Sequence, residues 1–411
     1  MEEGVREALL RELASRDDEL IAFLGELIAT PSPNPPGDEQ AVVRLLSDAL
    51  RAFGYRDLEI IASEPARPNL LARIGPKGGR SLALSGHVDT KPPGDVREWL
   101  TPPYEPTVVD GRLFGLGAAD MKGGVAAMIF AGRALAAVDA LEGELRLVLT
   151  ADEEAGAAHG ATYLVDRIET SDGILVGEPT GVNHPWDYLA VASRGVACFR
   201  IRVRGTQMHS SLTDRLPSVN ASVKLAGVLT KFAKCFRATV PEGSVWSVTV
   251  NPGVTLSGGV FYGVCPGEAE FGVDVRTLPG MTLAGLQDDV QAFLDVLRAE
   301  DPELEVEALW DPANAWFPPS SVDPHHRLVV AARAAASAIL DGPIPDGLFP
   351  GGTEGAIWAT RGMPVLPALG PGRLSDAHRP NESVGIDEVL AAARIYALTS
   401  LDFLRSGSQQ D

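Results

Sequence analysis

The chain has 411 residues, of which 45% are hydrophobic and 22% are charged, and its formal net charge is −20. This length predicts two domains, and this composition is typical of a soluble globular protein. The negative charge argues against nucleic acid as a partner, because nucleic-acid binding requires clustered lysine and arginine side chains. No apolar run is long enough to cross a membrane, so we expect no membrane partner either.

The cysteines and the N-terminal segment indicate a cellular location. Cys198, Cys235 and Cys265 lie far apart in the sequence and form no Cys-x-x-Cys pair. Three such cysteines favour thiols in a reducing compartment over a disulfide framework. The N-terminal segment is acidic and does not have the basic region and apolar core of a signal peptide. We therefore expect a cytoplasmic protein.

The first part of the chain alternates between helical and strand patterns up to about residue 180. Apolar residues recur at helical spacing over residues 5–29, and the proline-rich run that begins at Pro31 ends this helix. The other elements expected here are helices at 38–53 and 125–138 and strands at 58–62, 69–74, 81–84, 144–150 and 174–177. Such alternation is typical of an α/β layered domain.

Histidine and carboxylate residues follow three of these strands and occupy one glycine-rich turn. They are His87 and Asp89 after strand 81–84, Glu153 and Glu154 after strand 144–150, Glu178 after strand 174–177, and Asp120 before the helix at 125–138. Because the carboxyl ends of strands in an open α/β sheet share one edge, we expect these side chains to lie together. Clustered carboxylates repel one another unless cations neutralise them, so the pattern predicts metal ions at this edge.

Plainer interpretations exist for each of these features. A His-x-Asp at a strand end is commonly an ordinary turn, and three consecutive acids commonly form a solvated turn. The glycines Gly115 and Gly117 do not predict a phosphate loop, because Asp120 replaces the third glycine of the dinucleotide pattern and would repel phosphate. It is the accumulation of such residues at one edge that favours a metal site.

The donor types indicate which ions and which chemistry to expect. Imidazole and carboxylate ligands without cysteine suit Zn²⁺, Co²⁺ or Mn²⁺. Glu153 and Glu154 are adjacent, so their side chains point in different directions, and one can bind metal while the other faces a bound water. A free carboxylate beside such a water is the general base that hydrolysis needs. The spacing therefore favours a metal-assisted hydrolase over a single-metal or metal-free protein.

The pattern changes near Ser193. The following segments read, in order, as strand 197–203, helix 217–236, strands 245–256 and 269–275, helix 282–298 and strand 304–309. This βαββαβ order is that of a ferredoxin-like layer, and we interpret it as an insertion. The expected domains are a catalytic domain in two parts, 1–192 and 311–411, and an inserted domain at 193–310, with boundaries near Ser193 and Asp311. After the insertion we expect helices at 328–340 and 387–404, a strand near Val365 and a glycine-rich turn at 350–355.

Five motifs carry a family resemblance. They are SGHVDT at 85–90, GLGAADMKGG at 115–124, TADEEAG at 150–156, GEPT at 177–180 and SDAHRPNE at 375–382. With these motifs the chain resembles, over nearly its whole length, the acetylornithine deacetylase, succinyl-diaminopimelate desuccinylase and carboxypeptidase G family of co-catalytic metallohydrolases. The resemblance implies a zinc-peptidase-like α/β/α catalytic domain with an inserted ferredoxin-like (βαββαβ) dimerisation and lid domain. It also implies a homodimer formed through that lid.

The resemblance further implies two divalent metal ions per chain, with Zn²⁺ favoured over Co²⁺ or Mn²⁺. The implied ligands are His87, Asp120 and Glu178 for one ion, and Asp120, Glu154 and His378 for the other, with Asp120 bridging. Glu153 would be the general base and later the proton donor. Asp89 would orient His87, and the peptide bond between Asp120 and Met121 would be cis.

Substrate-binding positions are implied in the inserted domain and in the glycine-rich turn. His209 matches the residue that reaches a neighbouring subunit's site and polarises the scissile carbonyl. Arg276, Gly352 and Thr353 match substrate-binding positions, and the guanidinium of Arg276 suits a carboxylate. A surface position for His209 and a purely structural ion pair for Arg276 stay open as alternatives. Gly263 stands where desuccinylase-like members carry an asparagine, which disfavours the biosynthetic desuccinylase itself.

We therefore expect a di-metal hydrolase that cleaves the amide bond of an N-acyl amino acid or a related small amide that carries a carboxylate. Metal-activated water would attack the carbonyl, with Glu153 as the base. A peptidase, a carboxypeptidase and a hydrolytic deaminase of the same family are alternatives. A metal-poor protein that binds small molecules is the alternative from another class, and the complete ligand set together with Glu153 argues against it.

Overall fold

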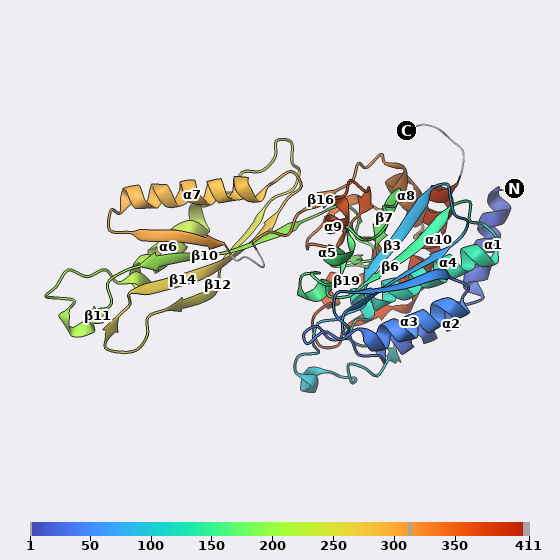
Figure 1. Cartoon of the computed structure of the whole chain (residues 1–411), viewed down its shortest axis with the longest axis horizontal. Helices are drawn as coiled ribbons and strands as arrows, with labels where there is room; N and C mark the ends of the chain where they lie inside the picture. The colour runs from blue at the N-terminus through green and yellow to red at the C-terminus, as the bar shows by residue number, and fades with distance from the viewer. Residues whose placement is uncertain (1, 311–314, 406–411) are drawn as a thin grey trace. The chain divides into compact units, whose positions relative to one another are not determined.

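The computed structural model describes residues 2–310 and 315–405, which divide into two compact units (Figure 1). Unit 2 consists of Ser193–Ser320 and Pro350–Gly352, and unit 1 contains the rest of the described chain. The second expected domain boundary, at Asp311, lies outside the described residues. None of the helices within residues 2–310 and 315–405 is long and apolar enough to cross a membrane.

A six-stranded sheet forms the centre of unit 1. Its strands, in spatial order, are β1 (Arg56–Ala62), β2 (Pro68–Ile74), β6 (Glu144–Thr150), β3 (Ser81–His87), β7 (Gly173–Val176) and β18 (Val365–Leu366). β3 runs parallel to both β6 and β7, whereas β2 is antiparallel to β1 and β6. Every residue of β3 is buried, as expected for a strand covered on both faces. The carboxyl ends of β6, β3 and β7 therefore meet at one edge of the sheet.

Helices cover both faces of this sheet. The helices of unit 1 are α1 (Glu2–Ala14), α2 (Asp17–Ile28), α3 (Gln40–Ala52), α4 (Gly123–Ala137), α5 (Ala161–Leu164), α8 (Arg327–Ile339), α9 (Gly355–Ala359) and α10 (Ile386–Leu404). Of these, α3, α4, α9 and α10 contact strands of the central sheet. α4 lies against β3 and α10, and a Cβ added at Gly86 of β3 would lie 2.5 Å from Met121 Cε, in the segment just before this helix. On the opposite face, Trp358 of α9 donates a hydrogen bond to Ser85 Oγ. Successive residues of β3 thus contact different helical layers.

Three smaller sheets also contain strands of unit 1. They are β4 (Thr107–Val109) with β5 (Arg112–Phe114) and β20 (Ser383–Gly385), β8 (Pro179–Gly181) with β19 (Gly370–Arg373), and β9 (Leu189–Ser193) with β16 (Ser320–Ser321) and β17 (Asp346–Phe349). β8 and β19 pair in parallel. Since β8 begins one residue after Glu178, this pairing fixes the backbone next to an expected metal ligand.

One expected helix is two helices in the structure. The prediction of a continuous helix over residues 5–29 is wrong, because α1 ends at Ala14 and α2 begins at Asp17. The Ser15 hydroxyl donates to the main-chain carbonyl of Glu12 at 2.7 Å. The three acidic residues that open α2 favour a new helix N-terminus at this point, since negative charge stabilises that end of a helix.

Unit 2 has the expected βαββαβ order. Its elements are β10 (Gly195–Arg204), α6 (Ala221–Cys235), β12 (Thr249–Gly258), β14 (Glu268–Thr277), α7 (Leu283–Glu300) and β15 (Glu305–Trp310), with a short pair of strands, β11 (Met208–His209) and β13 (Val264–Cys265). The four long strands form an antiparallel sheet in the order β12-β14-β10-β15. The helix expected to begin at Pro217 begins instead at Ala221, because the Asn220 side chain accepts a hydrogen bond from the Val223 main-chain N–H and caps it.

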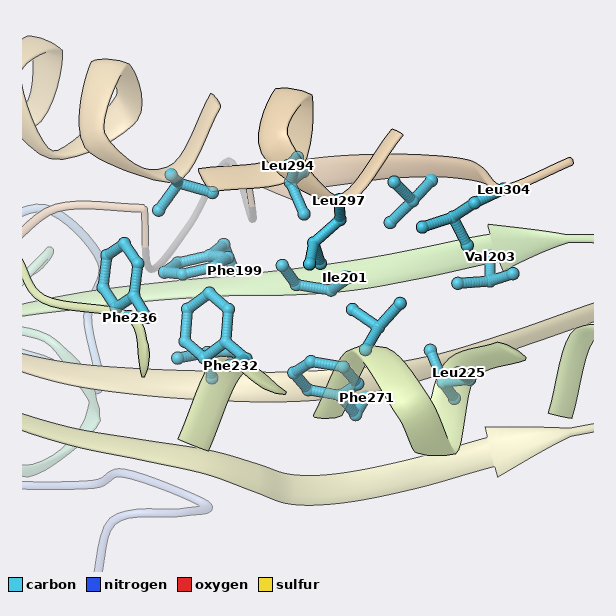
Figure 2. Packing of buried hydrophobic residues seen from close by; sticks show 14 of the residues in the cluster. Phe199, Ile201, Val203, Leu225, Phe232, Phe236, Phe271, Leu294, Leu297 and Leu304 are labelled. Carbon is cyan, nitrogen blue, oxygen red and sulfur yellow. The ribbon is translucent and has the colours of Figure 1, made fainter. Parts of the chain in front are cut away.

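Unit 2 has a hydrophobic core of its own. Alternate residues of β10 point inward, including Phe199 and Ile201, and the aromatic rings from the helices and from β14 pack against them (Figure 2). The ring of Phe232 stacks on Phe236 with centroids 4.4 Å apart and meets Phe271 edge-on at 6.1 Å. Such a core makes unit 2 a separately packed layer.

Replacing Phe232 by alanine should destabilise unit 2, because the ring is 1% exposed and lies at the centre of this aromatic cluster. We expect the free energy of unfolding to fall by about 3–5 kcal/mol, measured by urea unfolding followed by circular dichroism. Val223→Ala on the same helix is the control, since its side chain is 68% exposed and its loss should cost about 0.5 kcal/mol or less. Equal losses in the two variants would contradict this packing.

Candidate metal centre

The strand ends bring the expected ligands to one edge of the central sheet. β3 ends at His87, β6 is followed by a short turn that carries Glu154, and Glu178 comes two residues after the end of β7. Asp120 lies in the segment that precedes α4, where its peptide bond to Met121 is cis, as the resemblance implied. These positions follow from the parallel arrangement of β6, β3 and β7.

The two imidazoles face opposite oxygens of one carboxylate. His87 Nε2 lies 3.0 Å from Asp120 Oδ1 and 3.6 Å from Glu178 Oε1. His378 Nε2 lies 3.2 Å from Asp120 Oδ2 and 3.0 Å from Glu154 Oε2. Asp120 thus lies between two pairs of possible metal ligands, His87 with Glu178 and His378 with Glu154. A carboxylate that bridges two metal ions requires this position.

Glu153 also lies within this cluster. Two sets of ligand atoms fall within 4.8 Å of one another: one from His87, Asp120 and Glu154, and one from His87, Glu153 and Glu178. Glu153 is therefore as close to His87 as a ligand would be. Of the clustered side chains, the His378 imidazole is the most exposed at 45%, whereas His87 is fully buried. The centre therefore opens to solvent on the side of His378.

The crowding of carboxylates changes the protonation of the cluster. Burial raises the pKa of Glu153 to about 8, and the charges of Glu154 and Asp120 also raise it, against an opposing effect of His87. Burial and the charge of Asp120 likewise raise the pKa of Glu178 well above its usual value. Divalent cations at this place would neutralise the repulsion that these shifts reflect. The donor set, two imidazoles and three carboxylates without a thiolate, fits such ions.

The histidines show the complementary shift. Hydrogen bonds with Asp120 and Glu154 raise the pKa of His378 to about 10. Burial lowers the pKa of His87, but its hydrogen bonds with Asp120 and Asp89 outweigh this and raise it well above its usual value. The surrounding carboxylates thus favour the protonated, positively charged form of both imidazoles. A bound metal ion would supply positive charge at the same place.

Asp89 connects His87 to the turn that carries the two glutamates. His87 Nδ1 lies 2.9 Å from the main-chain oxygen of Asp89 and 3.5 Å from its carboxylate Oδ1. The carboxylate accepts hydrogen bonds from the main-chain N–H groups of Glu153 and Glu154, both at 3.2 Å, and from Asn34 Nδ2 at 2.8 Å. The imidazole of His87 therefore donates its hydrogen bond to the main-chain oxygen of Asp89, while the Asp89 carboxylate fixes the turn.

A buried polar network that the sequence reasoning missed supports this turn. Asn34 also donates to Asp152 Oδ1 at 3.0 Å, and Arg67 donates to the same oxygen. Arg67 in turn lies 3.1 Å from Glu39 Oε1, and all of these side chains are buried. Asn34 gave no signal in the sequence, because it stands in a proline-rich run that we interpreted only as a helix stop.

Three further residues near the centre were missed. Glu382 Oε1 accepts hydrogen bonds from the main-chain N–H groups of Ala119 and Asp120, both at 3.0 Å. Lys122 is buried and donates to the carbonyls of residues 27 and 30. Lys91 reaches Glu154 from the loop after β3. Glu382 and Lys122 lie inside the recognised motifs, so the motifs marked these positions without indicating their contacts.

The expected substrate-binding residues are divided between the units. Thr353 belongs to unit 1, is fully buried, and its hydroxyl has no hydrogen-bond partner among the described residues. Its neighbour Glu354 accepts a hydrogen bond from Thr150 Oγ1 at 2.5 Å and another from Ser85 Oγ. Gly352 belongs to unit 2, where an added Cβ would lie 2.9 Å from the Phe317 ring.

The other two expected residues lie in unit 2. His209 is exposed at the end of β11, and its Nδ1 accepts a hydrogen bond from the Ser211 main-chain N–H at 3.3 Å. Arg276, near the end of β14, forms a two-point ion pair with Asp274 on the same strand, at 2.9 and 3.0 Å. The guanidinium of Arg276 therefore already has a carboxylate partner within unit 2.

Comparison with known proteins agrees with this geometry. The model of peptidase family M20/M25/M40 matches residues 83–402. A succinyl-diaminopimelate desuccinylase of Gluconacetobacter diazotrophicus is 31% identical over 381 residues, which cover 90% of this chain and 94% of that protein. Among solved structures, the aminopeptidase PepT of Bacillus cereus has a TM-score of 0.73 at 20% identity, covering 95% of this chain and 99% of that one. The YXEP protein of Bacillus subtilis, titled a dinuclear metal-binding peptidase of the M20 family, has a TM-score of 0.65 at 16% identity, covering 95% and 99%.

These matches bear on both the motifs and the architecture. The matched segment begins four residues before His87 and extends past His378, so it includes all five motifs in full. The resemblance seen in the sequence is confirmed, and so is the fold class of an α/β domain with an inserted βαββαβ layer. The chain belongs to peptidase family M20/M25/M40.

Proposed function

We propose that the protein is a di-metal hydrolase that cleaves the amide bond of an N-acyl amino acid or a related small amide carrying a carboxylate. The observation that carries the proposal is the placement of Asp120 between the two imidazoles, each facing one of its oxygens, with a second carboxylate beside each imidazole. The curated relative named above removes a succinyl group, as its name states, and this is the hydrolysis of an amide.

The metal ligands in this proposal are those that the family resemblance implied. His87, Asp120 and Glu178 would hold one ion, and Asp120, Glu154 and His378 the other. The imidazole and carboxylate donors suit Zn²⁺, Co²⁺ and Mn²⁺, and we propose Zn²⁺ because the family resemblance implies it. Bound in this way, such ions activate water and polarise a carbonyl oxygen.

Glu153 moves the proton in this mechanism. Its carboxylate lies within the ligand cluster, close enough to face a water bound there, so it can accept a proton from that water and return it later. The acceptor of that proton would be the leaving nitrogen of the amide. Asp89 positions Glu153 by accepting the hydrogen bond from its main-chain N–H.

The family resemblance also implies the residues that would contact the substrate. Arg276, Gly352 and Thr353 are the proposed contacts to the substrate, with the Arg276 guanidinium directed to its carboxylate. His209 would polarise the scissile carbonyl in the site of a second copy of the chain. Its exposed imidazole supports this role, because no part of its own unit buries it.

A homodimer formed through unit 2 is part of the proposal. β12 is one of the two edge strands of the unit 2 sheet, and Val254 and Leu256 on it are 57% and 65% exposed. An edge strand with exposed apolar side chains favours pairing with another strand. We also propose a cytoplasmic location, which is supported by the absence of disulfides among the three cysteines, all of which lie in the described part of the chain.

The proposed activity can be tested with a substrate panel. The purified protein should contain about two divalent ions per chain by elemental analysis, and chelation should abolish turnover. The panel consists of N-acetyl, N-succinyl and N-carbamoyl amino acids, dipeptides and folate-like amides. We expect hydrolysis of at least one N-acyl amino acid. Inactivity of the metal-loaded protein on the whole panel would favour a small-molecule binding protein.

Replacing Glu153 by glutamine should lower kcat by about 10²–10⁴-fold, because the amide cannot accept the proton. Metal content should stay at the wild-type value, because the ligands are unchanged. Glu105→Gln, which alters an exposed glutamate, is the matched control and should leave kcat unchanged. Near-normal turnover in the Glu153→Gln variant would remove this residue as the base.

The action of His209 across subunits can be tested by mixing two inactive variants. His209→Ala should lower kcat without dissociating the dimer. When it is unfolded and refolded together with Glu153→Gln, each mixed dimer has one site with both residues intact. The mixture should therefore recover about a quarter of the wild-type rate, as expected for random pairing in a symmetric dimer. No recovery in dimers shown to have exchanged subunits would contradict action in trans.

A further inference from the structure

Lys91 brings a positive charge to one side of the metal centre. It lies two residues after Asp89, in the loop that follows β3, and its side chain is 35% exposed. Its ammonium lies 3.3 Å from Glu154 Oε2 and also donates a hydrogen bond to the main-chain oxygen of the same residue. Lys91 therefore contacts a carboxylate that is also 3.0 Å from His378 Nε2.

This contact distinguishes the two proposed metal sites. Within the described residues, Lys91 is the one lysine or arginine that forms an ion pair with any of the five expected ligands. His87 pairs with the carboxylates of Asp89, Asp120 and Glu178, and within the described residues Glu178 pairs with His87 alone. Arg67 contacts Asp152 and Glu39, which are not ligands. The charge of Lys91 is thus placed on the side of Glu154 and His378.

We infer that Lys91 makes the two metal sites unequal, by weakening the binding of the ion held by Glu154 and His378. The inference rests on the proposed di-metal function. A cation fixed beside a ligand repels a metal ion at that ligand, and it also competes for the carboxylate oxygen that the ion would use. Without metal, the same ammonium offsets part of the repulsion among the buried carboxylates, so it stabilises the metal-free protein.

A purely structural role for Lys91 predicts a different result. Through its bond to the Glu154 carbonyl, Lys91 could serve only to hold the turn that carries Glu153 and Glu154. Its removal would then loosen the turn and weaken metal binding. The charge effect predicts tighter binding instead, so the direction of the change in affinity separates the two roles.

The test is a titration of the metal-stripped full-length protein with Zn²⁺ in competition with a chromophoric chelator. In Lys91→Met we expect the Kd of the weaker site to fall by about tenfold or more, while that of the tighter site changes by about twofold or less. Thermal unfolding should show a lower Tm for the metal-free variant than for the metal-free wild type. With both ions bound, the Tm of the variant should equal or exceed that of the wild type.

Two control variants isolate the effect of the charge. Lys91→Arg keeps the charge and should bind Zn²⁺ like the wild type. Lys77→Met removes an exposed lysine that pairs with Asp57 on the surface, and it should leave both Kd values unchanged. An unchanged or weakened second site in Lys91→Met would overturn the inference while leaving the di-metal function intact. A wild-type protein that binds no Zn²⁺ would overturn both.

Discussion

Repulsion among buried carboxylates is the constraint on which the centre of this protein depends. Asp120, Glu154 and Glu178 are buried at one edge of a sheet, with Glu153 beside them, and burial raises the pKa of both Glu153 and Glu178. A fold that gathers these groups must supply positive charge to the same place. His87, His378 and Lys91 supply part of it, and the donor set indicates that divalent cations supply the rest.

The backbone of unit 1 holds the carboxylates in place despite this repulsion. β3 lies between β6 and β7 in parallel, so the chain leaves all three strands at the same edge. Asp89, which follows β3, connects the end of that strand to the turn after β6. Its carboxylate accepts hydrogen bonds from the main-chain N–H groups of Glu153 and Glu154. Glu382 does the same for the segment that carries Asp120. Hydrogen bonds to main-chain groups keep this geometry independent of whether the ligand side chains are charged.

The residues of the centre that the sequence predicted are those that follow a recognisable strand or stand in a family motif. His87, Glu154 and Glu178 follow buried strands, and the rule that parallel strands end at one edge brought them together. Asp120 required the family motif, because nothing in its local sequence places it between two imidazoles. Lys91 could not have been found in this way, because its contact depends on the course of a loop and on the direction of a long side chain. The helix break at Ser15 was missed for a similar reason, since the apolar spacing continues across it.

In the proposed function, substrate selection by Arg276 and His209 is separated from the chemistry of the metal centre. Its core is closed around Phe232 and Phe271, and the ion pair between Arg276 and Asp274 lies on a single strand of its own sheet. Substitutions at Gly263 or around His209, which lie outside this core, therefore need not disturb the packing of the unit or the proposed metal ligands of unit 1. If Arg276 binds the substrate as proposed, the substrate carboxylate would have to compete with Asp274 for its guanidinium. Only a carboxylate that is well placed for two hydrogen bonds would then displace Asp274.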